Sequence, residues 1–334
     1  MKPSLGYADY IKDQRLAEKA EVLDKIVATA KTADKVVFLG DNFNAKNNTS
    51  EVTKEFVALL ERINKPIYVL GGNHEVMSNG SSAIDFLREI KGKDWHIFTD
   101  KIETQDGITF CPYLTKQQLG VENDKDGQVK VMEQLAGGEL LMVHYAISDS
   151  MANSSTSTNL FSEVVLPRKE LEKRYQQIFA GHIHKPQSLG SKCKTIIAGS
   201  IFTNEVGEDE KFIWVYEDGK TEAIKLPNRP IIKLENPSEA DLLGCPDHSI
   251  VKVVITKEQS YAKLGELKDK LGKLFGERGA YLILEQIEKK RERLHYEHTG
   301  NVLEWKIEDL LLLYAKERKI DESKLQHGFE LIRQ

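Results

Sequence analysis

Two short apolar runs stand in residues 36 to 75, which read VVFLGDNFNAKNNTSEVTKEFVALLERINKPIYVLGGNHE. The runs occupy residues 36–39 and 67–70, and each ends in glycine followed by polar side chains. Between them, apolar residues recur at helical spacing from Val52 to Ile63. The order strand, helix, strand with short connections predicts that the two strands pair in parallel. The polar residues would then lie at the carboxyl ends of the strands.

The same pattern extends along the chain in both directions. Helical spacing predicts a helix over residues 14–31, and Asn48 is the expected N-cap of the helix that ends before Pro66. The stretch 150–163 is rich in Ser, Thr and Asn, which predicts a surface loop beside the site. Six short segments predict a second sheet packed against the first: 95–98, 108–111, 139–144, 177–180, 195–198 and 212–216.

The composition shifts near Pro227 and Pro230, which predicts a domain boundary. Strand, helix and strand are expected at 249–255, 259–275 and 280–286, and apolar residues from Trp305 onward predict two short helices. We therefore predict an α/β fold in three parts. These are a β-sandwich flanked by helices over residues 1–230, a small α+β domain over residues 231–298 and C-terminal helices over residues 299–334.

Composition narrows the class of protein. No apolar stretch approaches the roughly 20 residues that span a bilayer, and no signal-peptide core follows Met1, so a soluble, cytoplasmic protein is expected. The odd number of cysteines, three, predicts reduced thiols in packing roles. A net charge of −5 gives no global attraction to nucleic acid, so DNA binding would need a local basic patch such as residues 289–293. That run is equally consistent with a solvated helical face.

Four short motifs each follow an apolar run: Gly40-Asp41, Gly72-Asn73-His74-Glu75, Val143-His144 and Gly181-His182-Ile183-His184. Their residue types suit two divalent ions about 3.5 to 4 Å apart, which need oxygen and imidazole ligands. Asp41 can bridge both ions, while Asn73, His144 and His182 can complete the shell of one. His184 is expected to reach the other ion, because in an extended segment it shares a face with His182.

His74 and Glu75 are the candidate catalytic residues that bind no metal. His74 is placed to stabilise the transition state or to protonate the leaving oxygen, and Glu75 could orient it. Taken singly, Gly40-Asp41 is an ordinary turn, and the two histidines could be surface residues or a lone zinc site. The four motifs together favour one shared metal site. His96 formally completes an Asp-x-His triplet, but it begins a strand, so a structural role is favoured.

The ordered motifs resemble the calcineurin-like metallophosphoesterase superfamily, whose pattern is Asp-x-His, Gly-Asp, Gly-Asn-His-Glu, a histidine and Gly-His-x-His. The fuller arrangement resembles the SbcD-type nuclease subunits of bacteria and phages. Residues 36–43 match a strand that ends in Gly-Asp-x-Phe, and Ala198-Gly199-Ser200 with Glu205 and Lys211 resembles the segment that closes that domain.

The resemblance implies a metallophosphoesterase β-sandwich that binds two divalent ions, Mn²⁺ or else Mg²⁺. It implies exonuclease or endonuclease activity on double-stranded DNA ends in a repair and recombination complex. Residues 231–298 would cap the DNA, and the C-terminal helices would grip an SbcC-type ATPase. A homodimer is implied, without a membrane, in a bacterial cytoplasm or that of a phage host.

Two departures from the family pattern matter. Asn44 stands where an aspartate is usual, and the first motif, Asp-x-His, is absent, which leaves Asp41 and His184 for one of the two ions. Either the gene product starts upstream of Met1, or the protein is a one-metal or non-catalytic scaffold. A general phosphodiesterase or phosphatase for small substrates is the third reading.

Overall fold

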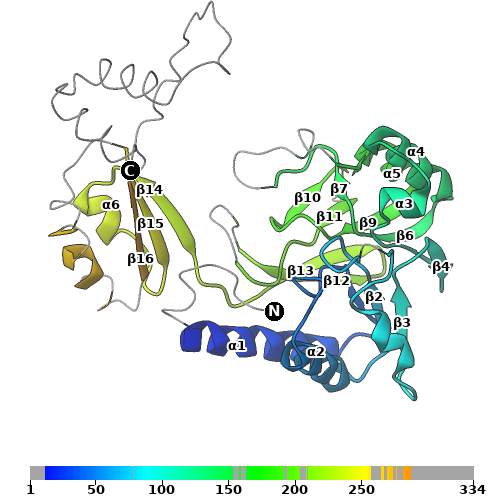
Figure 1. Cartoon of the computed structure of the whole chain (residues 1–334), viewed down its shortest axis with the longest axis horizontal. Helices are drawn as coiled ribbons and strands as arrows, with labels where there is room; N and C mark the ends of the chain where they lie inside the picture. Colours follow the sequence, from blue (N-terminus) through cyan, green and yellow to red (C-terminus); the bar gives the residue numbers. More distant parts are fainter. Residues whose placement is uncertain are drawn as a thin grey trace, which may run out of the picture. The chain divides into compact units, whose positions relative to one another are not determined.

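A computed structural model of the chain, shown in Figure 1, describes residues 12–77, 79–152, 158, 163–191, 194–203, 208, 210–256, 265–266, 269–273, 276 and 281–286. The chain divides into two compact units, Met1–Ile287 and Glu288–Gln334. The expected partner-binding segment 299–334 and most of the loop 150–163 lie outside the described residues. Among the described helices, none is both long enough and apolar enough to cross a membrane.

The first sheet is parallel and three-stranded, with the order β1-β2-β3. Its strands are β1 (Val36–Phe38), β2 (Ile67–Leu70) and β3 (Trp95–Phe98), and the helices that precede β1 and β2 are α1 (Lys12–Ala30) and α2 (Ser50–Ile63). The predicted parallel pairing is confirmed, since Val36 pairs with Ile67 and Phe38 with Val69.

The central strand β2 is buried on both faces, and its residues alternate between two cores. Ile67 and Val69 pack with α1 and α2, whereas Tyr68 and Leu70 pack against the second sheet. Each buried side chain of this kind stabilises the fold by about 1.5–3 kcal/mol. The alternation explains why this strand is an uninterrupted apolar run.

The start of α2 differs from the expectation. The N-cap is Thr49, whose hydroxyl accepts a hydrogen bond from the backbone N–H of Val52 over 3.4 Å. The side-chain amide of Asn48 instead donates to the carbonyl of Ala45. Both residue types cap helices well, so the sequence pattern did not separate two neighbours. The helix ends as expected, at Asn64 in the left-handed region with φ 49°.

The second sheet is six-stranded, with the order β10-β11-β9-β6-β5-β4. Its strands are β4 (Glu103–Gln105), β5 (Ile108–Cys111), β6 (Gly138–Val143), β9 (Tyr175–Ala180), β10 (Gln187–Leu189) and β11 (Thr195–Ile197). Met142 of β6 and Phe179 of β9 face the first sheet. Leu141 and Val143 of β6 lie on the opposite face, in the core shared with α4 and α5.

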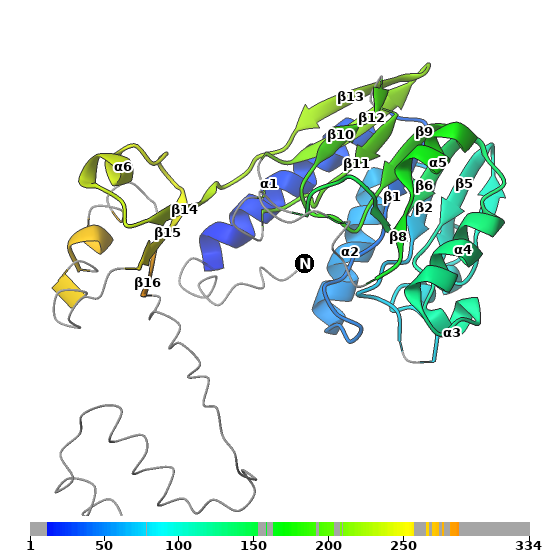
Figure 2. The same cartoon turned by 90° about the horizontal axis from the view of Figure 1, so that it is seen from above.

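The outer helices of that core are α3 (Lys116–Leu119), α4 (Asp124–Gln134) and α5 (Arg168–Arg174). The three apolar cores therefore separate four layers: α1 with α2, the first sheet, the second sheet, and α3 to α5. Figure 2 shows α1 and α2 on one side of the strands and α3 to α5 on the other. This arrangement is the α/β sandwich flanked by helices that the sequence predicts.

Two of the six segments expected in the second sheet lie elsewhere. Trp95–Phe98 pairs with Ile67–Leu70 in the first sheet. The segment 212–216 lies in β12 (Phe212–Glu217), which pairs with β13 (Lys220–Lys225) as a separate two-stranded sheet. Alternation of apolar residues identifies a strand but carries no information about its partner, which is why the sequence assigned both segments wrongly.

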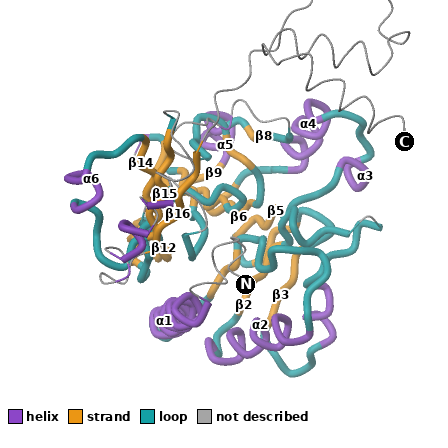
Figure 3. Tube along the Cα trace, turned by 60° about the vertical axis from the view of Figure 1, so that its left-hand side comes forward, coloured by secondary structure: helices purple, strands orange, loops and turns teal. Residues whose placement is uncertain are grey.

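The described residues after 230 contain a further parallel sheet of three strands, visible in Figure 3. Its strands are β14 (Ile231–Glu235), β15 (Ile250–Ile255) and β16 (Tyr281–Gln286), and α6 (Glu239–Leu243) follows β14. The strands expected at 249–255 and 280–286 are thus confirmed. Between them the described residues, 265–266, 269–273 and 276, are helical. The role of this unit in capping DNA stays a prediction.

Short elements complete the fold. The strands β7 (Ala146–Ile147) and β8 (Val165–Leu166) form a two-stranded parallel sheet, and η1 (Asp85–Glu89) is a 3₁₀ turn. The functional consequence of the topology lies at the strand ends. Because β1 pairs parallel with β2, and β6 with β9, the polar segments after each pair leave the same edge of their sheet.

Candidate metal centre

Asp41 follows β1 on a backbone that few residues adopt. Its φ is 53°, and that of Gly40 is 91°, so both lie in the left-handed region. A Cβ atom on Gly40 would stand 2.2 Å from Nδ1 of His144, so only glycine fits there. The resulting turn directs Oδ1 of Asp41 to the backbone N–H of His74 at 3.0 Å. Its Oδ2 lies 3.3 Å from Nε2 of His144.

His144 is completely buried at the end of β6. Its Nδ1 lies 2.6 Å from the carbonyl oxygen of Leu39. A carbonyl only accepts hydrogen bonds, so Nδ1 carries the proton and donates it. When the ring is neutral, Nε2 presents its lone pair toward Asp41 and toward Oδ1 of Asn73, which is 3.1 Å away.

His182 is held in a comparable way at the end of β9. Its Nε2 lies 2.9 Å from Oε1 of Glu163, and its Nδ1 lies 2.9 Å from Oδ1 of Asn73. The backbone differs from the expected extended segment: φ of His182 is 74°, and the N–H of Ile183 donates to the carbonyl of Gly181. These features define a rare γ-turn, so alternation along a strand does not describe how His182 and His184 project.

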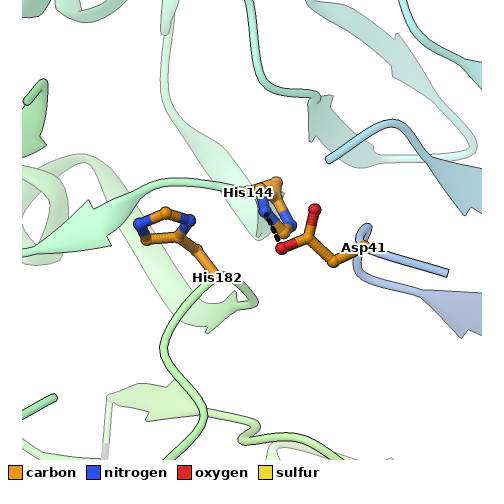
Figure 4. Close-up of side chains that lie close together, drawn as sticks. All are labelled: Asp41, His144 and His182. Carbon is orange, nitrogen blue, oxygen red and sulfur yellow. Dashed lines mark ion pairs between the residues drawn. The ribbon is translucent and has the colours of Figure 1, made fainter. Parts of the chain in front are cut away.

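Four side chains thus turn acceptor atoms toward one shared point: Asp41, Asn73, His144 and His182. With neutral rings, the two imidazole nitrogens that face Oδ1 of Asn73 carry no hydrogen. Figure 4 shows three of these side chains converging from separate segments. Ligand atoms of Asp41, His144 and His182 all lie within 4.8 Å of one another. Carboxylate and amide oxygens with imidazole nitrogens suit Mn²⁺ and Zn²⁺ well. This donor set fits a divalent cation.

The charges in the cluster also favour binding of a cation. Burial by itself raises the pKa of Asp41, but the charge and hydrogen bond of His144 and the N–H of His74 bring that pKa down to about 2. Burial lowers the pKa of His144, but the charge and hydrogen bond of Asp41, the carbonyl of Leu39 and the charge of Glu75 together outweigh it, so this pKa is raised. The carboxylate therefore needs a positive charge beside it, which either a proton on His144 or a metal ion supplies.

Gly72 sits directly against the carboxylate of Asp41. A Cβ atom at this position would lie 2.1 Å from Oδ1 of Asp41 and 2.2 Å from its backbone nitrogen. The backbone of Gly72 can therefore pass Asp41 only because it lacks a side chain. This close approach brings Asn73, the next residue, to His144 and His182.

The two predicted catalytic residues lie in different surroundings. His74 is exposed, while Glu75 is fully buried. Oε1 of Glu75 accepts from the N–H of Phe43, and Oε2 accepts from the N–H of Gly72, at 3.0 and 2.8 Å. Burial raises the pKa of Glu75 to about 7. These hydrogen bonds tie Glu75 to the loop backbone, and a role in orienting His74 stays a prediction.

His184 lies outside the cluster formed by the other described ligand groups. Its Nδ1 contacts Oε1 of the buried Glu208 at 3.0 Å. The ammonium of Lys211, also buried, lies 3.0 Å from Oε2 of Glu208 and donates to the carbonyl of His184 and to Oγ of Ser200. His184 is thus held at its ring and at its backbone. Its service to a second ion stays a prediction.

Sequence reasoning missed the groups that stand behind the two histidine rings of the cluster and behind His184. These are the carbonyl of Leu39, the carboxylate of Glu163 and the carboxylate of Glu208. The first is backbone and has no sequence signal. Glu163 is the last residue of the polar stretch 150–163. The only sequence signal for its role was that this stretch was predicted to lie beside the site.

A family model for calcineurin-like phosphoesterases matches residues 12–186, just over half of the chain. The chain belongs to the calcineurin-like phosphoesterase family. The matched range contains all four motifs and every residue of the metal cluster. In a calcineurin-like phosphoesterase, a cluster of this composition holds a divalent metal. Curated protein sequences gave no significant match to the chain.

Proposed function

We propose that this calcineurin-like phosphoesterase is a metal-dependent DNA nuclease subunit of the SbcD type. The observation that carries the proposal is the convergence of Asp41, Asn73, His144 and His182 at the strand ends, with both histidine tautomers set by partners behind the rings. Residues held in this way form a preorganised site for a divalent ion. The exposed His74 lies beside it, because it follows Asn73 directly in the loop after β2.

The residues of the chain divide the work of phosphodiester hydrolysis. A bound divalent cation lowers the pKa of a water molecule and neutralises charge on the phosphoryl oxygens. Asp41, Asn73, His144 and His182 would hold that cation. His74, whose backbone N–H is fixed by Asp41 at 3.0 Å, is exposed and would protonate the departing sugar oxygen.

The nuclease reading rests on the segment after the phosphoesterase core. A free-standing phosphatase for small substrates needs no additional domain, yet β14, β15 and β16 form a further sheet after residue 230. We infer that this unit caps duplex DNA ends, that residues 299–334 bind an SbcC-type ATPase and that the chain acts as a homodimer. Mn²⁺ is the expected metal, with Mg²⁺ as the alternative.

A one-metal or non-catalytic scaffold is the second candidate. The observation in its favour is that His184, which was expected to serve the second ion, lies outside the cluster that the described ligand groups Asp41, His144 and His182 form. A scaffold would bind DNA and the ATPase without cutting. Both candidates allow an ion at Asp41, His144 and His182. The nuclease also needs a second ion at Asp41 and His184, and only the nuclease cuts DNA.

One assay separates the three readings. The full chain is incubated with end-labelled linear duplex DNA, and in parallel with a small phosphodiester, bis(p-nitrophenyl) phosphate, in Mn²⁺ and with the ATPase partner present. A nuclease degrades the DNA, and Asp41→Ala abolishes this while the exposed control Asp34→Ala does not. His74→Ala should lower the rate by about 10²–10⁴-fold. His96→Ala, outside the site, should leave it unchanged.

Three other outcomes would contradict the nuclease assignment. Cleavage of the small phosphodiester alone would replace the nuclease with a general phosphodiesterase. DNA binding without cleavage of either substrate would support the scaffold. DNA cleavage that persists in full in Asp41→Ala would show that the activity arises elsewhere.

The partner assignment needs its own test. A chain lacking residues 299–334 should fail to capture an SbcC-type ATPase in a pull-down, whereas the full chain should capture it. Equal capture by both chains would refute the assignment of the C-terminal segment.

A further inference from the structure

We propose that Glu163 is a positioning residue that orients the ring of His182 toward the metal. The inference rests on the proposed metal site and adds a residue that lies outside all four motifs. Glu163 precedes β8, and its Oε1 lies 2.9 Å from Nε2 of His182. The opposite ring nitrogen, Nδ1, faces Oδ1 of Asn73 at 2.9 Å.

The ring needs such a partner because its own backbone does not lock it. His182 sits at the centre of a γ-turn with φ 74°, a strained conformation outside the regular strand β9. Ile183 is buried and anchors the turn. That anchor leaves the imidazole to be set by its contacts. Asn73 and Glu163 hold its two nitrogens, and the ring of His144 lies edge-to-face against it with centroids 5.4 Å apart.

Two properties allow Glu163 to orient the ring of His182: its backbone is held by a buried neighbour, and its side chain is a carboxylate. The next residue, Val164, is buried in the core that contains α4 and α5, so the backbone at Glu163 has a fixed neighbour. Its side chain is about one-third exposed, while that of His182 is 13% exposed. A carboxylate accepts but does not donate, so it places the proton on Nε2 and leaves the lone pair of Nδ1 for the cation.

The two histidines of the cluster therefore receive different support. His144 is fully buried and is held by a neutral backbone carbonyl. His182 is partly exposed and is held by a charged side chain. A carboxylate behind a ligating imidazole raises its basicity, and loss of such a partner typically weakens metal binding by about 10 to 100-fold.

Metal binding, measured without any substrate, tests the role. Isothermal titration of Mn²⁺ into the full chain should give an affinity about 10 to 100-fold weaker for Glu163→Ala than for the unmodified protein. Glu163→Gln keeps an acceptor oxygen and should recover part of the loss. The matched control is Glu170→Ala, which removes an exposed glutamate on α5. Thermal melts in EDTA confirm that each variant is folded.

The order unmodified, Glu163→Gln, Glu163→Ala, from tight to weak, supports the positioning role. An affinity of Glu163→Ala within twofold of Glu170→Ala overturns it. Asp41→Ala separates this failure from failure of the proposed function. If Asp41→Ala loses Mn²⁺ and Glu163→Ala does not, only the role of Glu163 is wrong, whereas unchanged binding by Asp41→Ala removes the metal site itself.

Discussion

The carboxylate of Glu75 accepts a hydrogen bond from the backbone N–H of Phe43 over 3.0 Å, and so joins the loop after β2 to the loop after β1. The same carboxylate accepts from the N–H of Gly72 at 2.8 Å. Both metal-binding loops, which carry Asp41 and Asn73, are thus tied to one buried group. Glu75 stabilises the frame of the site, whatever its part in catalysis.

Replacement of Glu75 should destabilise the protein. Glu75→Ala leaves two backbone N–H groups without their acceptor in a buried place, and each costs about 1–3 kcal/mol. Glu75→Gln should also destabilise, because one of its two oxygens becomes an N–H₂ group that faces a donor. We expect a loss of about 2–4 kcal/mol in the free energy of unfolding, measured by urea denaturation in EDTA. The exposed Glu122→Ala should change it little, and an equal effect of both would contradict this role.

Gly72→Ala should damage both the metal site and the local fold of its loop, because the new Cβ would also lie 2.2 Å from the backbone nitrogen of Asp41. The new methyl group would meet Oδ1 of Asp41 at 2.1 Å, so the carboxylate must move. Mn²⁺ affinity should fall by about tenfold or more, since a displaced ligand costs at least about 1.4 kcal/mol. Gly272→Ala, where a Cβ meets nothing within 4 Å, is the control. Unchanged Mn²⁺ affinity in Gly72→Ala would mean that Asp41 does not bind the ion.

Metal removal should lower thermal stability. At a Mn²⁺ concentration about 100 times its dissociation constant, binding stabilises the fold by about 2.7 kcal/mol, so the melting temperature should rise by several degrees over that in EDTA. Asp41→Asn keeps the shape of the side chain but removes its charge, and should lose most of this rise. The exposed Asp34→Asn should retain it. A rise of the same size in both variants would place the bound ion elsewhere.

Lys211 should be essential for stability. Lys211→Met leaves the carboxylate of Glu208 buried without its cation and removes the donor to the carbonyl of His184, for a loss of about 3–5 kcal/mol in the free energy of unfolding. The double variant with Glu208→Gln should recover part of that loss. Lys225→Met breaks an exposed pair with Glu210 and should cost no more than about 1 kcal/mol. Similar losses for both lysines would show that burial of Lys211 has no energetic consequence.

Local patterns predicted much of the first half of the chain. The apolar runs that became β1 and β2 are recognisable as strands because every residue in them is apolar. Strand β2 is buried on both faces, and β1 is half-buried. Parallel pairing followed from the short helical connection. The positions of Asp41 and Asn73 followed from the rule that parallel strands end at one edge, while His144 and His182 were indicated by motifs that each follow an apolar run. Their order in the chain also placed it in its family.

Other features depend on contacts between distant segments. The segment Trp95–Phe98 has the same alternation whether it joins the first or the second sheet, and only the packing of the layers assigns it to β2. The separate hairpin formed by β12 and β13 escaped prediction for the same reason. Pairing is decided by the fit of whole faces, which no short window of sequence contains.

The site divides along the same line. The residue types and their order along the chain indicated that a carboxylate, an amide and two imidazoles would meet, and the structure brings them together from the strand ends of two sheets. The orientation of each ring was decided by tertiary contacts: the carbonyl of Leu39 behind His144, and Glu163, 19 residues from its partner, behind His182. The sequence determines which residue is a ligand. The tautomer of a ligating histidine depends on which acceptor the fold places at its other ring nitrogen.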